Sequence, residues 1–387
     1  MINFEDTKPV FAHKSNWELK KSYYLFSILQ HSFFVKIGSL LLKISFFLRI
    51  PIKKIIKMTI FNQFCGGENI QDCSKKINEL YEFGIGTILD YSVEGKENES
   101  DFEKTKEEII QTILFSSKNS KIPFTVFKIT GLGKSSLIEK ASLDFQSLED
   151  NELVELNLVA IRVDEICKVA NENRVPVFVD AEDSWYQDYI DKVVESMIFK
   201  YNNEFSIVYN TIQLYRHDRL NYMKDLISRC NSNGKNLGLK LVRGAYMEKE
   251  REQATKKNYP DPIQIDKQAT DNDFTKAIEY CIENIKTVSL CAGTHNEKSI
   301  LHLIDLMKKS SLKNNDSRIC FAQLLGMSDH ISYNLSEQGY NVAKYVPYGP
   351  IKEVIPYLIR RAKENTSVSG QTGRELSLIK IELENRI

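Results

Sequence analysis

The sequence predicts an α/β fold: a closed (βα)8 barrel of the TIM type, preceded by an N-terminal helical arm. Two observations lead to this prediction. Short runs rich in β-branched and aromatic residues recur eight times, and helix-like stretches separate them. Strands that alternate with helices pair in parallel, and eight such units over about 270 residues suit a barrel, whose usual size is about 250 residues. A doubly wound open sheet is the alternative, but it normally shows fewer strands and a glycine-rich first turn.

The predicted strands are bounded mostly by Gly, Pro or Asn. In chain order they are GIGTILDY (84–91), FTVFKITG (124–131), VPVFVDAE (175–182), SIVYNTIQ (206–213), LGLKLVRG (237–244), TVSLCAGT (287–294), SRICFAQLLG (317–326) and YNVAKYVPYG (340–349). Helical periodicity is clearest in residues 153–173, before the third strand, and in residues 273–286, before the sixth. We therefore expect a helical arm over residues 1–75, a barrel over 76–370 and a helical tail over 371–387.

Two polar segments carry separate predictions, a loop over residues 95–108 and an active-site lid over residues 251–273. Residues 95–108 (GKENESDFEKTKEE) are acidic and should lead into the first barrel helix. Residues 251–273 contain prolines and follow a strand end, which in a barrel is the catalytic face. This second segment is therefore predicted to form an active-site lid.

Composition excludes several classes of protein. The 387 residues carry 52 basic and 52 acidic side chains, which argues against nucleic acid as a partner. The seven cysteines are odd in number and form no C-x-x-C pair, so buried, reduced thiols of a cytosolic protein are expected. The six histidines show no metal-ligand spacing, and no metal site is predicted.

Residues 33–60 are apolar but are interrupted by lysines and an arginine every few positions. No apolar stretch approaches the ~18 residues of a membrane-spanning helix. Two interpretations stay open: a basic amphipathic segment on an anionic membrane surface, and, slightly favoured, a helical arm whose apolar face covers the barrel. No signal-peptide pattern is present, and we expect a cytoplasmic chain. Because the start is not rich in Arg and Ser, a bacterial origin is favoured over the alternative of a mitochondrial one. The first interpretation would make the chain peripheral on the inner membrane.

Barrel enzymes carry their chemistry at the carboxyl ends of the strands. Polar side chains stand at six of the eight predicted ends: Lys128, Asp180 with Glu182, Gln213, Lys240 with Arg243 and Tyr246, Thr294 with His295, and Tyr345. Any one of them has a structural explanation, such as a helix cap for Asp180, but a purely structural barrel has no need for all of them.

The last barrel helix carries Arg360, Arg361 and Glu364. Adjacent helical residues diverge by about 100°, so one arginine can hold a carboxylate with its planar fork while the other takes a neighbouring group. A solvated basic helix face is the alternative. Together with Lys128, Lys240 and Arg243, the arginines predict anionic ligands, namely a substrate carboxylate and a phosphate-bearing cofactor. Gly244 and Ala245 would let a large flat ligand approach the backbone.

The segment GLGKSS (131–136) superficially resembles a phosphate-binding loop. A P-loop requires glycine where this chain has Lys128, and the third glycine of a dinucleotide turn is also missing. The segment is interpreted as an ordinary βα turn.

These residues resemble the proline dehydrogenase family. The matching stretches, in the family's order over roughly residues 80–370, are FKITG (127–131), FVDAE (178–182), IQLYR (212–216), KLVRGAYMEKE (240–250), GTHN (293–296), QLLGM (323–327), YVPYG (345–349) and LIRRAKEN (358–365). The resemblance implies a (βα)8 flavoenzyme that oxidises L-proline to Δ1-pyrroline-5-carboxylate, transfers a hydride from C5 to N5 of FAD and passes electrons to a quinone.

The resemblance also implies roles for single residues. Arg360 and Arg361 would hold the substrate carboxylate with Lys128 beside them, while Asp180 would order this cationic cluster. The implied catalytic residues are Asp180, Lys240, Arg360 and Arg361. Tyr246, Leu324 and Tyr345 would form walls around the ring. Implied cofactor contacts are Ala181, Gln213, Lys240, Arg243, Gly244, Ala245, Thr294, His295, Asn296 and Glu364.

Some family members have arginine at the position of Lys240 and lysine at that of Arg243, which keeps the charge but changes the hydrogen-bond geometry. Three other functions stay open. They are a Schiff-base aldolase-type barrel that uses Lys128 or Lys240, an inactive membrane-associated binding protein, and a relative that prefers hydroxyproline. Tyr345 would crowd a ring hydroxyl, which favours proline over hydroxyproline.

Overall fold

The computed structural model describes residues 2–47, 52–93, 97–367 and 371–387. Its eight strands form a closed barrel in the order β1 to β8, which confirms the predicted fold class. The strands are β1 (Ile85–Tyr91), β2 (Phe124–Phe127), β3 (Val177–Val179), β4 (Val208–Gln213), β5 (Leu237–Val242), β6 (Val288–Gly293), β7 (Ile319–Leu324) and β8 (Val342–Tyr348). Each lies within one of the eight predicted runs.

The chain divides into two compact units. The first comprises residues 1–94 and 323–387, so both ends of the chain contribute to it. In this unit β1 pairs in parallel with β8, from Ile85 opposite Val342 to Tyr91 opposite Tyr348. The second comprises residues 95–322, in which parallel pairing runs from β2 through to β7.

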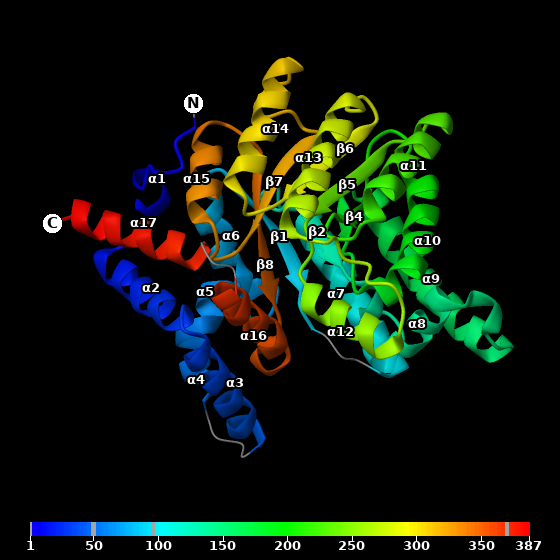
Figure 1. Cartoon of the computed structure of the whole chain (residues 1–387), viewed down its shortest axis with the longest axis horizontal. Helices are drawn as coiled ribbons and strands as arrows, with labels where there is room; N and C mark the ends of the chain where they lie inside the picture. The colour runs from blue at the N-terminus through cyan, green and yellow to red at the C-terminus, as the bar shows by residue number, and fades with distance from the viewer. Residues whose placement is uncertain (1, 48–51, 94–96, 368–370) are drawn as a thin grey trace. The chain divides into compact units, whose positions relative to one another are not determined.

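Helices of the first unit include those of the predicted arm and tail. They are α1 (Lys8–Phe11), α2 (Asn16–Leu29), α3 (Ser32–Phe47), α4 (Lys53–Ile56), the π-helical turn η1 (Lys57–Phe61), α5 (Asn62–Phe64), the 3-10 turn η2 (Gln71–Cys73), α6 (Ser74–Tyr81), α15 (Asp329–Glu337), α16 (Ile351–Ser367) and α17 (Gln371–Asn385). The helices α17 and α2 lie side by side (Figure 1).

Helices of the second unit follow the strands in the alternation expected of a barrel. They are α7 (Glu99–Ser117), α8 (Ser135–Leu143), α9 (Asp150–Glu172), α10 (Ser184–Tyr201), α11 (Arg219–Ser232), α12 (Met247–Lys257), α13 (Lys267–Glu283) and α14 (Glu297–Lys309), with 3-10 turns η3 (Ile129–Gly131) and η4 (Phe145–Ser147). The GLGKSS segment is the turn between β2 and α8, as predicted.

The loop expected over residues 95–108 was wrong, because within the described residues 99–108 belong to α7. The active-site lid expected over residues 251–273 stays a prediction. Helix α7 begins at Glu99 because the Asn98 side chain accepts a hydrogen bond from the Asp101 backbone N–H at 3.0 Å. The expected lid over 251–273 consists mostly of α12 and α13, and only residues 258–266 connect them. Asp266 caps α13 by accepting from the Ala269 N–H at 2.7 Å, so polar residues here start a helix.

Aromatic packing forms part of the core of the second unit and supports the candidate site. The rings of Phe124 and Phe178 stack with centroids 4.5 Å apart, and Tyr209 meets Phe178 edge-on at 5.2 Å. Phe178 lies on β3 and is fully buried. These ring contacts join β2, β3 and β4, the strands that lead to Lys128, Asp180 and Gln213.

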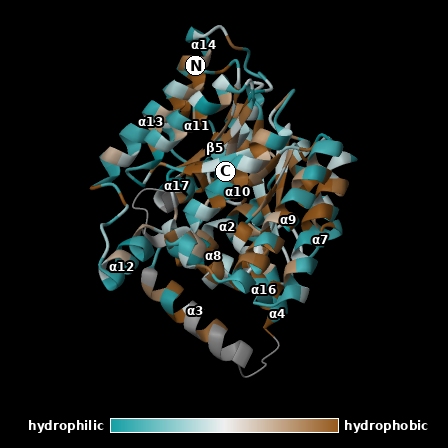
Figure 2. Cartoon of the chain, turned by 90° about the vertical axis from the view of Figure 1, so that its right-hand side faces the viewer, coloured by the Kyte–Doolittle hydropathy of each residue, from teal (hydrophilic) through white to brown (hydrophobic). Residues whose placement is uncertain are grey.

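The arm leaves part of its apolar surface uncovered. Val35 of α3 is buried, but Phe33, Ile37 and Leu41 of the same helix are exposed, and Figure 2 shows apolar residues along α3. Within the described ranges, no helix is both long and apolar enough to cross a bilayer. All seven cysteines are buried free thiols, as predicted.

Candidate active site

Lys240 and Asp180 form an ion pair within the second unit. Lys240 lies on β5 and is 4% exposed, and its ammonium group lies 5.5 Å above the Phe178 ring. Asp180 directly follows β3, and its backbone N–H donates to the Phe127 carbonyl at 2.9 Å. Two residues predicted to be catalytic are therefore brought together, with the lysine held between a carboxylate and an aromatic face.

Glu182 lies two residues beyond Asp180 and is buried. Its carboxylate accepts from the Thr130 N–H at 3.0 Å and from the Thr130 hydroxyl. Burial raises the pKa of Glu182 to about 7, although the charge of Lys128 and the Thr130 hydrogen bonds act in the opposite direction. Lys128, predicted to bind substrate, thus shares its surroundings with a carboxyl group that titrates near neutral pH.

A hydrogen-bonded cluster joins three of the predicted cofactor residues. The Arg243 guanidinium donates to Asp271 at 2.7 Å, to the Thr294 hydroxyl at 2.8 Å and to the Ser299 hydroxyl at 2.9 Å. Asn296 donates its backbone N–H to the Thr294 hydroxyl at 3.2 Å and caps α14. A cation and a helix N-terminus at one place suit a phosphate group. His295, between Thr294 and Asn296, is half-buried.

Gln213, at the end of β4, is 3% exposed. Its Oε1 atom is buried and finds no hydrogen-bond partner within the part of the chain that the structure describes. An unsatisfied buried acceptor costs roughly 1–3 kcal/mol, so a donor on a bound ligand would offset a real penalty. This observation fits the predicted contact between Gln213 and a flavin.

Gly244 and Ala245 are exposed, and Ala181 is half-buried. Gly244 has φ of 126°, and a Cβ atom there would lie 2.4 Å from the Tyr215 ring. The close approach that requires glycine in this structure is therefore that of Tyr215. The exposed backbone of Gly244 and Ala245 still leaves room for a ligand on its open side.

Helix α12 is anchored by Glu250, for which the sequence had predicted no role. Glu250 is fully buried and accepts from the Ser184 N–H at 2.7 Å. Burial raises the pKa of Glu250. Tyr246, a predicted substrate residue, is half-buried and directly precedes α12, one helical turn before Glu250. The Glu250 carboxylate therefore fixes the end of the helix that lies next to Tyr246. The i, i+4 spacing was the signal available in the sequence.

In the first unit, Arg361 of α16 is 8% exposed and pairs with Glu364 at 2.5 Å. Its guanidinium lies 5.2 Å from the centroid of the Tyr357 ring. Burial raises the pKa of Glu364, against the opposing effect of Arg361 and Arg360. Arg360 is half-buried. The two arginines are therefore not a solvated basic face, because Arg361 is sequestered among aromatic and acidic groups.

Leu324 and Tyr345 also belong to the first unit. Tyr345 is 8% exposed on β8, and Leu324 is half-buried at the end of β7. The Leu325 N–H donates to the Tyr345 carbonyl at 2.9 Å, so these two predicted wall residues are held on neighbouring backbone. The other predicted site residues, apart from Arg360, Arg361 and Glu364, lie in the second unit.

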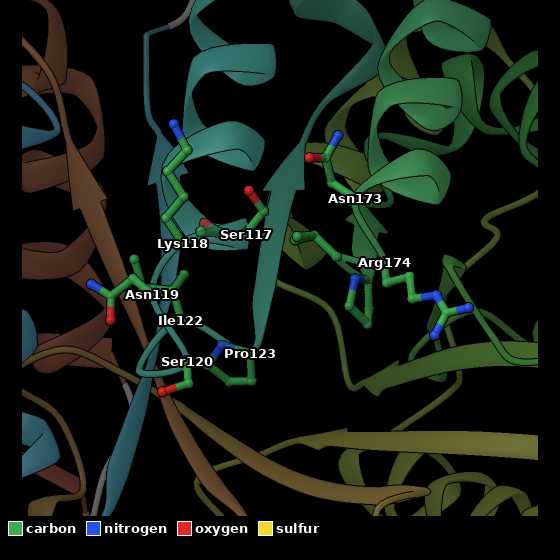
Figure 3. A pocket seen from close by; sticks show the side chains of 11 residues that line it. Ser117, Lys118, Asn119, Ser120, Ile122, Pro123, Asn173 and Arg174 are labelled. Carbon is green, nitrogen blue, oxygen red and sulfur yellow. The ribbon is translucent and has the colours of Figure 1, made fainter.

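A separate pocket of about 480 Å³ lies in the second unit, before β2 and β3 (Figure 3). Its lining includes Ser117, Lys118, Asn119, Pro123 and Arg174. This is the amino-terminal end of those strands, where barrel residues serve stability rather than catalysis. We assign no chemistry to it.

The closed parallel barrel and the ionic groups at its strand ends define an enzyme of the (βα)8-barrel class. Residues 73–374 match a family model described as proline dehydrogenase. The chain belongs to the proline dehydrogenase family, which confirms the resemblance, and it is an oxidoreductase.

Similar proteins include one named as a proline dehydrogenase and one named as a hydroxyproline dehydrogenase. It is 33% identical to proline dehydrogenase 1, mitochondrial, of Dictyostelium discoideum, over 99% of this chain and 75% of that protein. It is 30% identical to hydroxyproline dehydrogenase of Xenopus laevis, over 98% of this chain and 89% of that protein.

Solved structures support the fold. Proline utilization A from Bdellovibrio bacteriovorus, inactivated by N-propargylglycine, matches with a TM-score of 0.75 and 19% identity. The match covers 95% of this chain and 42% of the other, so this chain spans less than half of that protein.

Proposed function

We propose that this protein oxidises L-proline to Δ1-pyrroline-5-carboxylate, the first step of proline catabolism, with FAD accepting the hydride from ring carbon C5 at its N5 atom. Family membership supports the reaction class. The observation that carries the assignment is the burial of Arg361, with its Glu364 partner, beside half-buried Arg360. Such a site can bind a small carboxylate, because guanidinium groups are held in a place from which water is largely excluded.

We propose that Arg360 and Arg361, with Lys128, bind the proline carboxylate and that Tyr246, Leu324 and Tyr345 enclose the ring. Binding through the carboxylate orients the ring without touching its reacting carbon. Cationic surroundings favour the neutral amine, and loss of a hydride requires the nitrogen lone pair that a protonated amine lacks. Asp180 keeps Lys240 in place through the ion pair.

The residues present fit FAD. Gln213 offers a buried acceptor that lacks a partner among the described residues. Lys240, Arg243, Gly244 and Ala245 would lie along the flavin and its pyrophosphate. Thr294, His295 and Asn296 would hold the adenine half, with Ala181 and Glu364 at further contacts. The hydrogen-bonded cluster around Arg243 supports this assignment, because guanidinium and hydroxyl groups can donate hydrogen bonds to an anionic cofactor.

An absorption spectrum of the purified protein tests the function. We expect a yellow protein whose flavin bands bleach when proline is added without oxygen, and bleach more slowly with 4-hydroxyproline. Faster bleaching with hydroxyproline would favour the activity for which the Xenopus relative is named. A colourless protein that borohydride links to its substrate would instead establish a Schiff-base mechanism at Lys128 or Lys240.

We propose that a quinone is the electron acceptor and that the protein reaches it at a membrane surface. Exposed apolar residues of α3 and of the following turns support this, namely Phe33, Ile37, Leu41, Ile55 and Met58. Exposed lysines at positions 36, 53 and 54 lie along the same segments. Apolar and basic residues together favour an anionic bilayer surface.

A further inference from the structure

The short loop between β7 and α15, residues 325–328, begins directly after the predicted wall residue Leu324. Two of its residues have left-handed backbone, Gly326 with φ of 73° and Ser328 with φ of 49°. A Cβ atom on Gly326 would lie 2.3 Å from the Gln63 carbonyl oxygen. Such conformations persist where surrounding groups fix them, so the partners of this loop matter.

Lys344 holds the loop from β8. Its side chain is fully buried, and its ammonium group donates to the carbonyls of Met327 at 2.6 Å and Leu324 at 3.3 Å. The same group pairs with Asp329 at 2.9 Å, and Asp329 also pairs with Lys14 at 3.4 Å. Burial acts to raise the pKa of Asp329, but Lys344 and Lys14 outweigh it, and the pKa lies well below its usual range.

Glu375 holds the loop from the C-terminal helix α17. It is 8% exposed, accepts a hydrogen bond from the Ser328 N–H, and lies 3.9 Å from His330. Gln63 adds a third contact by donating to the Gly326 carbonyl at 3.3 Å. Each loop residue from Gly326 to Ser328 is thus fixed by a side chain from a distant part of the sequence.

Charged groups are an expensive way to hold a loop, because a buried ion pair can often be replaced by apolar residues without loss of stability. Here the charged groups fix the backbone of the loop in one conformation. The loop follows Leu324 directly, and its Leu325 N–H donates to the Tyr345 carbonyl. We propose that Lys344 and Glu375 are positioning residues that set the substrate-ring wall formed by Leu324 and Tyr345. This inference rests on the proposed function, in which that wall contacts the ring.

The test compares Glu375→Leu with Glu375→Gln and with Glu382→Leu in the full-length, flavin-loaded enzyme. Glu382 is the matched control, because it is buried on the same helix but bonds to Thr7 at 2.6 Å and Arg386 at 2.7 Å, not to the loop. We expect Glu375→Leu to raise the KM for proline about tenfold, or ~1.4 kcal/mol, and to reduce discrimination against 4-hydroxyproline. Glu375→Gln keeps an acceptor for the Ser328 N–H and should restore both values.

Glu382→Leu should lower thermal stability and leave KM and discrimination unchanged. Gln63→Leu removes a half-buried donor from the same loop, so it provides a second variant that should fold, and its KM should rise about threefold. Unchanged KM and discrimination in both Glu375→Leu and Gln63→Leu would overturn the inference. Failure of the wild-type protein to oxidise proline would instead overturn the proposed function.

Discussion

Two carboxyl groups of the candidate site, the buried Glu182 and the half-buried Glu364, stand beside cationic residues, and both have a raised pKa. Glu364 pairs with Arg361, and Glu182 accepts hydrogen bonds from Thr130 in the surroundings of Lys128. In each case burial outweighs the attraction of the neighbouring cation. The sequence identified the cations and Glu364, but the burial that sets these pKa values depends on packing.

Replacing Arg361 with Met should lower kcat/KM for proline by a factor that corresponds to ~2–5 kcal/mol, as for a buried charge that loses its partner. Arg361→Lys keeps the charge but not the planar fork, so its loss should be intermediate. Arg374→Met, which removes an arginine from an ion pair with exposed Glu5, is the control and should change little. Steady-state kinetics measure all three, and full activity in Arg361→Met would remove the carboxylate assignment.

Glu182→Gln should change stability in a pH-dependent way. A folded pKa of about 7, above the ordinary 4.5, means that the protonated carboxyl stabilises the fold. That contribution is complete below about pH 4.5 and is lost as pH rises through about 7. Since the amide mimics the protonated acid, the variant should match wild type near pH 5 and exceed it by on the order of 3 kcal/mol near pH 8. Denaturant unfolding at both pH values measures the free energies of unfolding. The same difference between variant and wild type at pH 5 and at pH 8 would contradict the prediction.

At the scale of elements, strands were predicted better than helix boundaries. Runs such as 206–213 and 237–244 are apolar because both faces of a barrel strand are covered, and this signal is local. Residues 99–108 and 251–257 are polar because the helices they form are largely solvated, so their composition resembled that of a loop. Caps at Asn98 and Asp266 were local signs of these helices. Ion pairs such as Lys240 with Asp180 join residues far apart in sequence, so pattern alone predicted the partners but not the pairing.

The proposed membrane interaction is assigned to helix α3. Replacing Phe33, Ile37 and Leu41 with Ser should reduce binding to anionic vesicles at least about tenfold, because apolar area and lysines act together there. Val154, Leu158 and Ile161 of α9 are also exposed apolar residues, but acidic residues such as Glu155 and Glu165 accompany them. Ser at those three positions is the matched control and should not affect binding. Co-sedimentation at low and high salt is the measurement, and equal loss in both variants would contradict a specific α3 surface.

At the scale of the whole molecule, the predicted cofactor residues and the predicted substrate residues lie mostly in different units. All predicted cofactor residues except Glu364 lie in the second unit, and the arginines and two of the wall residues lie in the first. Terminal segments 2–16 and 371–387 are joined to each other and to the rest of the first unit, since Arg386 donates to the Phe11 and Lys14 carbonyls at 2.7 Å and Lys14 pairs with Asp329 at 3.4 Å. The order of the barrel strands was predictable from the sequence, whereas this joining of both chain ends was not, because it depends on contacts over more than 360 residues.

Removal of FAD should lower the stability of the folded chain. A variant at Gln213 should distinguish the stability that comes from FAD binding from the stability of the barrel itself. FAD at a hundredfold excess over its Kd should stabilise the native state by ~2.7 kcal/mol, which raises the melting temperature by several degrees. Gln213→Met removes a buried acceptor that has no partner in the described chain. The flavin-free variant should thus melt at or above the flavin-free wild type, while its gain on adding FAD should be smaller. Thermal melts with and without FAD measure both quantities. A variant that is destabilised without flavin yet gains the full increment would show that Gln213 serves the barrel and not the cofactor.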